Sequence, residues 1–182
     1  PDWEHARMLL MFGVAEDHDS NPIKMGLGKL KTRGAKFVSV NPIRTGYSAI
    51  ADQWISIRPG TDGLFVMSLI HQLMKSDNID IEYLVRYTNA HWLVINDPGA
   101  ADDGLFARDK DGNPLCWDGK TKALANARSP EVSSAVVGDY ELPDGRKAHP
   151  SFNLVASRYL DDKYAPANVA EQTGLNQETI EQ

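Results

Sequence analysis

The sequence predicts an α/β fold, with a parallel sheet flanked by helices, a loop-rich insertion and a C-terminal helix pair. In residues 6–95, short apolar segments alternate with segments of helical periodicity. Such alternation with short links is typical of a parallel sheet with right-handed crossovers. Residues 97–149 are rich in Asp, Gly, Pro and Asn, which favour turns and loops. Helical spacing of apolar residues returns from position 150 onward.

The first strand and helix are marked by apolar residues and by proline and glycine. Residues 8–12 form a continuous apolar run, as a strand buried on both faces requires. A helix is expected over 22–32, because proline suits its first turn and Gly34 suits its C-terminal cap. A second strand is expected at 36–40, followed by a short helical stretch near 48–51.

The next segments continue the alternation. We expect a strand at 54–57 and a helix over 61–75. Apolar residues cover most of the circumference of that helix, so we expect it to be largely buried. A helix over 80–87 and a strand at 91–95 complete the predicted parallel sheet.

The insertion carries turn signals rather than long periodic segments. Residues 105–108 and 115–117 could pair as a hairpin, and 135–142 could supply an edge strand. Helices are then expected from position 150 and over 166–173.

We therefore expect three parts. Residues 1–96 form a Rossmann-like dinucleotide-binding core, residues 97–149 the insertion, and residues 150–182 the C-terminal helices. The sequence begins without methionine or a signal-like segment, and it stops inside a helix that Asn176 caps. We expect an excised, truncated piece of a longer protein, whose localisation signals lie outside this chain.

Composition excludes several classes of function. A net charge of −6 argues against nonspecific nucleic-acid binding. A single cysteine, Cys116, excludes an internal disulfide and any cysteine-based metal or cluster site within the chain. No apolar run approaches the roughly 20 residues of a membrane span, so we expect no direct membrane insertion.

Polar groups follow two of the predicted strands. Asn41 and Pro42 come after the second strand, and Gly60, Thr61 and Asp62 open the helix after the third. The carboxyl ends of parallel strands meet at one edge of a sheet, where nucleotides bind in open α/β folds. Backbone N–H groups at a helix start attract phosphate, and Asp62 can accept hydrogen bonds from a ribose or a base. The alternative is a simple turn at Asn41 and ordinary helix capping by Thr61 or Asp62.

Two arginines near this edge are candidate phosphate ligands through bidentate hydrogen bonds. Arg44 has a polar neighbour, Thr45, and ranks above Arg58 for that reason. Arg58 could instead form a structural ion pair with Asp52.

The loop after the first strand lies at the same edge and offers Glu16 and Ser20. Residues 16–19, Glu-Asp-His-Asp, superficially suggest a metal site. Adjacent residues rarely converge on one ion without partners elsewhere, so we assign no metal to them. No Ser-His-Asp or Cys-His arrangement is evident, and His71 is expected to be a hydrogen-bonded core residue. We therefore assign no catalytic residue.

The motifs of residues 34–62 resemble the dimethyl sulfoxide reductase superfamily of molybdopterin-guanine-dinucleotide oxidoreductases. The family pattern is a Gly-Ala-Lys strand, an Asp-Pro-Arg turn, an Ala-Asp pair, and a loop of (Arg/Lys)-x-Gly-(Thr/Ser)-(Asp/Asn). The matching segments are Gly34-Ala35-Lys36, Asn41-Pro42, Ala51-Asp52 and Arg58-Pro59-Gly60-Thr61-Asp62. The resemblance covers residues 6–95 well and 150–182 weakly.

The chain departs from this family pattern at two positions. Asn41 replaces the usual Asp, and the arginine lies one place later, at Arg44. Asn accepts hydrogen bonds only through its carbonyl oxygen, which favours ribose or water-bridged contact over guanine recognition. In the loop after the first strand, the family has a pattern similar to Gly-x-Asn-x-x-x-Ser-His-Pro. Glu16 lies nearest the Asn of that pattern, and Ser20 and Pro22 match its Ser and Pro. The motifs are closest to sulfite-dehydrogenase-like or formate-dehydrogenase-like members.

The resemblance implies an internal fragment of a catalytic subunit. Such a fragment would bind the guanosine and phosphate part of one pterin dinucleotide of bis-molybdopterin guanine dinucleotide (bis-MGD), which carries molybdenum or tungsten. An iron–sulfur cluster is implied in the parent protein only. The implied partners are an iron–sulfur electron-transfer subunit, together with the other domains of the same catalytic subunit, in the prokaryotic cytoplasm or periplasm. The candidate cofactor contacts are Glu16, Ser20, Asn41, Pro42, Arg44, Thr45, Arg58, Gly60, Thr61 and Asp62.

Two other classes stay open. The same sheet edge could belong to a stand-alone nucleotide-binding or regulatory domain without redox activity. The loop-rich segment could instead make the chain a subunit-docking module. Binding of a guanine nucleotide separates the first two classes from the third.

Overall fold

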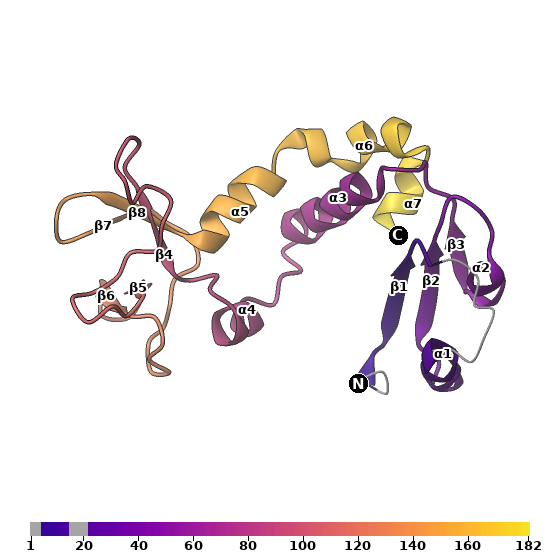
Figure 1. Ribbon diagram of the computed structural model, residues 1–182, viewed down its shortest axis with the longest axis horizontal. Helices are drawn as coiled ribbons and strands as arrows, with labels where there is room; N and C mark the ends of the chain where they lie inside the picture. The colour runs from indigo at the N-terminus through magenta and orange to yellow at the C-terminus, as the bar shows by residue number, and fades with distance from the viewer. Residues whose placement is uncertain (1–4, 15–21) are drawn as a thin grey trace. The chain divides into compact units, whose positions relative to one another are not determined.

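A computed structural model describes residues 5–14 and 22–182 of the chain (Figure 1). The chain forms two compact units. Unit 1 comprises Pro1–Gln72 and Asp162–Gln182, and unit 2 comprises Leu73–Asp161. The predicted ranges 1–96, 97–149 and 150–182 do not coincide with these units and stay predictions about domain organisation.

Unit 1 contains the parallel sheet. Strands β1 (Met8–Phe12), β2 (Lys36–Val40) and β3 (Gln53–Ile55) lie side by side in that order, as Figure 1 shows. Both pairings are parallel, and the register aligns Phe12 with Val40 and Val40 with Ile55. The carboxyl ends of the three strands therefore meet at one edge, as the sequence predicted for this part of the chain.

Helices pack on both faces of this sheet because successive residues of β2 point to opposite sides. Phe37 packs with Leu27 and Tyr47, which come from two helices on one side. Val38 and Val40 pack on the other side with residues of the remaining helices. The helical segments of unit 1 are α1 (Pro22–Thr32), α2 (Gly46–Ile50), α3 (Asp62–Lys75), the 3₁₀ turn η2 (Asp162–Tyr164), α6 (Pro166–Thr173) and α7 (Gln177–Glu181), and η2 lies against α6 rather than in the clusters on the sheet.

The C-terminal segment completes the core of unit 1. Val169 of α6 and Ile180 of α7 join Phe65 of α3 in the cluster around β2 and β3. All three side chains are at most 2% exposed. Burial of each such side chain contributes about 1.5–3 kcal/mol, so the end of the chain contributes directly to the sheet that carries the candidate site.

The prediction that the helix over 61–75 is largely buried is wrong. In α3 only Phe65, Ser68 and His71 are buried, whereas Val66 is 38% exposed and Leu73 is 46% exposed. One helix face suffices to cover the sheet, and periodicity in a uniformly apolar helix does not show which side chains stay exposed.

Unit 2 is built from antiparallel strands and two helices. Strand β4 (Leu93–Asn96) pairs with β8 (Lys147–Pro150), which also pairs with β7 (Tyr140–Glu141). Strands β5 (Leu115–Asp118) and β6 (Ala123–Asn126) form a separate hairpin. The helices, described within this unit, are α4 (Ile81–Tyr87) and α5 (Ser151–Tyr159).

One prediction about strand pairing is wrong, and another is confirmed in part. The strand expected at 91–95 exists as β4, but it does not extend the parallel sheet. The hairpin expected between 105–108 and 115–117 is present in short form, since Arg108 bridges Pro114 in antiparallel fashion and the N–H of Leu115 donates to the oxygen of Ala107 at 2.9 Å. Residues 115–118 pair more extensively, as β5, with β6. A short apolar run predicts a strand without revealing its partner, because the pairing is set by residues distant in sequence.

Candidate functional site

The candidate residues that the structure describes follow β2 and β3, at the carboxyl edge of the parallel sheet. Asn41, Pro42, Arg44 and Thr45 lie in the turn between β2 and α2. Arg58, Gly60, Thr61 and Asp62 lie between β3 and the first turn of α3. Glu16 and Ser20 lie outside the described residues.

Asn41 is 6% exposed, and both ends of its amide group are hydrogen-bonded within the protein. Its Nδ2 donates to the backbone oxygen of Val14 at 3.1 Å, and its Oδ1 accepts from the N–H of Ile43 at 3.4 Å. Asn41 thus links the loop after β1 to the turn after β2. The turn interpretation of Asn41 accounts for these contacts.

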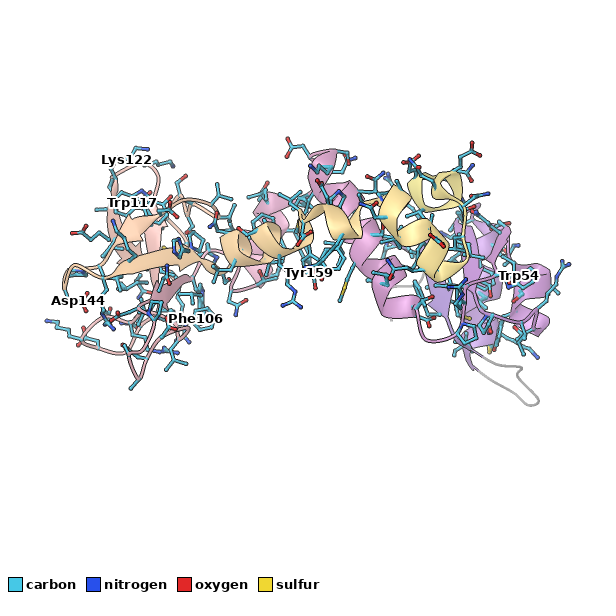
Figure 2. All side chains as sticks on the ribbon, turned by 90° about the horizontal axis from the view of Figure 1, so that it is seen from above. Trp54, Phe106, Trp117, Lys122, Asp144 and Tyr159 are labelled. Atoms are coloured by element: carbon cyan, nitrogen blue, oxygen red, sulfur yellow. The ribbon has the colours of Figure 1, made fainter. Side chains whose placement is uncertain are left out.

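The rest of this turn is anchored to β3. Trp54 donates its indole N–H to the backbone oxygen of Asn41 at 2.9 Å (Trp54 is labelled in Figure 2). The N–H of Asn41 donates to the oxygen of Ile55 at 3.0 Å. Ser56 donates its hydroxyl to the oxygen of Pro42 at 3.5 Å. The turn is therefore anchored by three hydrogen bonds to β3 and to Ser56 just after it.

Arg44 and Thr45 differ sharply in exposure. The Arg44 side chain is exposed, and its guanidinium carbon lies 5.9 Å from the centre of the Trp54 ring. Thr45 is 6% exposed, with its hydroxyl 3.3 Å from that of Ser48. Of these two, Arg44 is the one accessible to an anion.

The predicted alternative of an Arg58–Asp52 ion pair is wrong. Arg58 donates from Nη1 to the backbone oxygen of Gln172 at 2.9 Å, and its N–H donates to the oxygen of Thr173 at 2.8 Å. Asp52 pairs with Lys31 at 3.1 Å instead. Arg58 is exposed, and it connects the loop before α3 to the C-terminal segment.

The loop Gly60–Asp62 combines a tight turn with a helix start. Gly60 has φ +81°, a left-handed conformation that favours glycine. A methyl group at Gly60 would meet no described heavy atom within 4 Å, so the space beside the loop is open. Thr61 donates its hydroxyl to the oxygen of Arg58 at 2.7 Å, and α3 begins at Asp62. The first N–H groups of α3 lack intrahelical partners, as at any helix start, and favour negative charge.

Asp52, just before β3, bonds to the backbone of β2 and to Lys31 of α1. Its carboxylate accepts the N–H of Phe37 at 2.7 Å, and this bond, followed by the bond from Lys31, holds its pKa below the ordinary value. A lowered folded-state pKa gives stability that is present above the unfolded-state pKa and is lost as pH falls through the folded-state pKa.

We expect Asp52→Asn to have a lower urea midpoint than the wild type at pH 7. The difference should shrink as pH falls below about 4, where the unfolded-state carboxyl protonates. Hydrogen exchange of the amides of residues 38–40 at increasing urea concentration, in both proteins between pH 7 and pH 3, measures this convergence in unit 1 alone. Asp111→Asn, in an exposed loop, is the control and should track the wild type. A difference that stays constant with pH would exclude the carboxylate charge as its cause.

Sequence reasoning missed two residues that shape the site. Trp54 was not among the candidate residues, and Asp52 was considered only within the Ala51-Asp52 motif and as a possible ion-pair partner of Arg58. The hydrogen bond from the Trp54 indole to a backbone oxygen and the one from a strand N–H to the Asp52 carboxylate have no recognisable sequence motif. The pairing of β3 with β2 brings Trp54, and Asp52 just before β3, next to β2.

The rest of the described chain adds no competing centre. In residues 5–14 and 22–182, no group of His, Cys, Asp and Glu could hold a metal ion. Cys116 is fully buried, and burial raises the pKa of its thiol, which disfavours the reactive thiolate. His71 is 3% exposed on the buried face of α3, as expected. No helix in these residues is both long and apolar enough to cross a membrane.

Comparisons with known proteins extend over nearly the whole chain, although no family model matches it. The chain is 42% identical over 189 aligned residues to a sulfite dehydrogenase subunit of Allochromatium vinosum, covering 99% of this chain and 19% of that protein. It is 24% identical to the alpha subunit of perchlorate reductase from Dechloromonas aromatica, covering 98% of this chain and 23% of that protein. The alpha subunit of formate dehydrogenase 2 from Nitratidesulfovibrio vulgaris is 26% identical, over 95% of this chain and 16% of that protein. The chain thus spans about a fifth of the length of the curated relatives that it matches.

The fold is also found in solved structures, as one example shows. Acetylene hydratase from Pelobacter acetylenicus superposes with a TM-score of 0.56 at 18% identity. The match covers 97% of this chain and 16% of that one. At this identity the similarity concerns the fold alone.

Proposed function

We propose that this chain binds the guanosine and phosphate end of one pterin dinucleotide. It would do so as part of a longer catalytic subunit, because its homologues are catalytic subunits across the dimethyl sulfoxide reductase superfamily of molybdopterin oxidoreductases. The homology confirms the resemblance that the motifs of residues 34–62 indicated. Relatives named as sulfite and formate dehydrogenases are both among the matches.

The observation that carries the proposal is the alignment of the described strand ends. Parallel pairing of β1, β2 and β3 brings the Asn41–Thr45 turn and the Arg58–Asp62 loop to one sheet edge. The edge offers exposed guanidinium groups, the N–H groups of a helix start and open space beside Gly60. This donor set suits a pyrophosphate with an attached nucleoside.

Each residue would have a limited task. The N–H groups at the start of α3 and the Arg44 guanidinium would bind phosphate oxygens. Asp62 would accept hydrogen bonds from ribose hydroxyls or from guanine N–H groups. Asn41 would act through the loop geometry that it fixes. The molybdopterin cofactor, bearing molybdenum or tungsten, would supply the redox chemistry.

The remaining functions belong to the parent protein in this proposal. An iron–sulfur cluster, the ligand of the metal and the substrate funnel would come from other domains and from an electron-transfer subunit. The isolated chain would then bind nucleotide without turning over any substrate.

We expect the isolated chain to bind GDP, and Asp62→Ala to weaken binding about tenfold or more, as loss of a hydrogen bond to a charged group does. Isothermal titration calorimetry measures both affinities. Glu82→Ala, an acid in the first turn of α4 in unit 2, is the matched control and should leave affinity unchanged. Unchanged affinity in Asp62→Ala would remove Asp62 from the site. Absence of GDP binding by the wild type would contradict the proposed function and favour a docking role.

A further inference from the structure

The structure separates the two arginines that the sequence offered as phosphate ligands. Arg58 already donates to the backbone oxygen of Gln172. Arg44 lies over the face of Trp54, and no described carboxylate is within ion-pair distance of it. The Arg44 guanidinium makes no hydrogen bond to a described residue, and its cation–π attraction to the ring is electrostatic. Arg44 therefore keeps its full donor set while its position is restrained.

Trp54 restrains Arg44 in two ways. Its ring face carries the guanidinium, and its indole N–H holds the backbone oxygen of Asn41, three residues before Arg44. Both contacts come from one side chain on β3, the strand next to β2. Tryptophan is the side chain that combines a large ring face with an N–H donor at its edge.

We propose that Trp54 is a positioning residue, which presents the Arg44 guanidinium to a phosphate group at the carboxyl edge of the sheet. This inference rests on the proposed function and assigns the phosphate contact to one arginine. Trp54 orders the backbone from which Arg44 projects and reduces the rotamer freedom of its long side chain before the anion arrives. The loss of conformational entropy of the Arg44 side chain then occurs on folding rather than on binding, which favours affinity. Trp54 itself does not contact the phosphate in this arrangement.

The test is a double-mutant cycle with inorganic pyrophosphate and GDP as probes. Arg44→Gln should weaken pyrophosphate binding about tenfold or more. Trp54→Leu should weaken it about two- to fivefold when Arg44 is present, and should have no further effect in the Arg44→Gln background. Trp54→Phe retains a ring face but loses the indole N–H, so its affinity should lie between those of the wild type and Trp54→Leu.

A second Arg–Trp pair provides the matched control. In unit 2, Arg128 lies 5.7 Å from the centre of the Trp92 ring. Trp92→Leu removes the same kind of contact elsewhere and should leave pyrophosphate affinity unchanged. Hydrogen exchange at the Trp54 indole N–H reports the bond to Asn41 without any ligand, and it should be slower than at the solvent-exposed indoles of the unfolded chain.

The outcomes separate this inference from the proposed function. If pyrophosphate binds and the effects of Trp54→Leu and Arg44→Gln on its affinity are not additive, the inference is supported. This holds even if GDP binds no more tightly than pyrophosphate. Binding of GDP with additive effects of Trp54→Leu and Arg44→Gln overturns the inference and leaves the nucleotide site in place. Loss of affinity in Trp54→Leu that persists in the Arg44→Gln background shows a structural role only. Absence of binding to either probe overturns both.

Discussion

Phe65→Ala is expected to lower the free energy of unfolding of unit 1 by about 3–5 kcal/mol, the usual range for removal of a buried phenylalanine. Phe65 is 1% exposed and belongs to the cluster that joins α3 to residues of β2, β3, α6 and α7. Its ring centre is 6.1 Å from that of Phe12 on β1. The substitution leaves a cavity between α3 and the sheet, which the rigid strands can fill only in part.

The measurement must report on unit 1 alone. Because the chain has two compact units, a probe of the whole chain would mix their unfolding transitions. Native-state hydrogen exchange of the β2 amides, residues 37–40, follows the parallel sheet directly. Val66→Ala is the control on the same helix, since Val66 is 38% exposed. Its cost should stay below about 1 kcal/mol. Equal costs in both variants would show that α3 does not pack on the sheet through Phe65.

Locally signalled elements were predictable to the residue. Helix α1 spans Pro22–Thr32 and helix α6 spans Pro166–Thr173, each with proline at its start and with a glycine of positive φ beyond its end. Strand β2 also matches its predicted range. Proline and glycine act on the backbone within one or two residues, so their effect can be inferred without knowledge of the fold.

Pairing of distant segments was not predictable in the same way. The apolar residues of β4 suit a strand in either sheet type, and its partner β8 lies 51 residues beyond the end of β4, from Asn96 to Lys147. The alternation of strands and helices correctly predicted the parallel pairing of β1, β2 and β3. The same alternation wrongly predicted that β4 extends the parallel sheet, because α4, the helix before β4, does not connect two parallel strands.

The candidate site shows the same division. The motifs placed Asn41, Arg44 and Asp62 at one sheet edge, and the parallel pairing of β2 with β3 agrees with that placement. The motifs did not reveal that the Asn41 amide is occupied by Val14 and Ile43, or that Trp54 holds the turn. These contacts depend on side-chain directions in neighbouring strands. The assignment of each residue to the cofactor stays a prediction.

Asn41→Asp is expected to destabilise unit 1 by about 3 kcal/mol at pH 7, although Asp is the residue that the family pattern has at this position. The Asn41 amide donates to the backbone oxygen of Val14, and a carboxylate cannot donate. The substitution therefore removes a hydrogen bond and places a buried negative charge, at a site that is 6% exposed, against a carbonyl oxygen.

The pH dependence of this variant has a defined sign. Burial and the facing carbonyl favour the protonated carboxyl, so its pKa in the folded state should lie above the unfolded value. The folded state then binds more protons, and stability rises as pH falls. The defect should be full above the folded-state pKa and should shrink toward the unfolded value of about 3.9. Hydrogen exchange of the β2 amides at several pH values, compared with wild type, measures this recovery.

Asn176→Asp is the control that isolates the cause, because it makes the same chemical change where only an acceptor is needed. Asn176 caps α7, and its Oδ1 accepts the N–H of Thr179 at 2.8 Å. A carboxylate accepts this bond equally well and interacts favourably with the helix N-terminus. We expect the control to match wild-type stability at pH 7. If Asn41→Asp matched it too, the bond to Val14 would contribute nothing to stability. Asn41 would then be available to contact a nucleotide directly, as its position in the motif suggests.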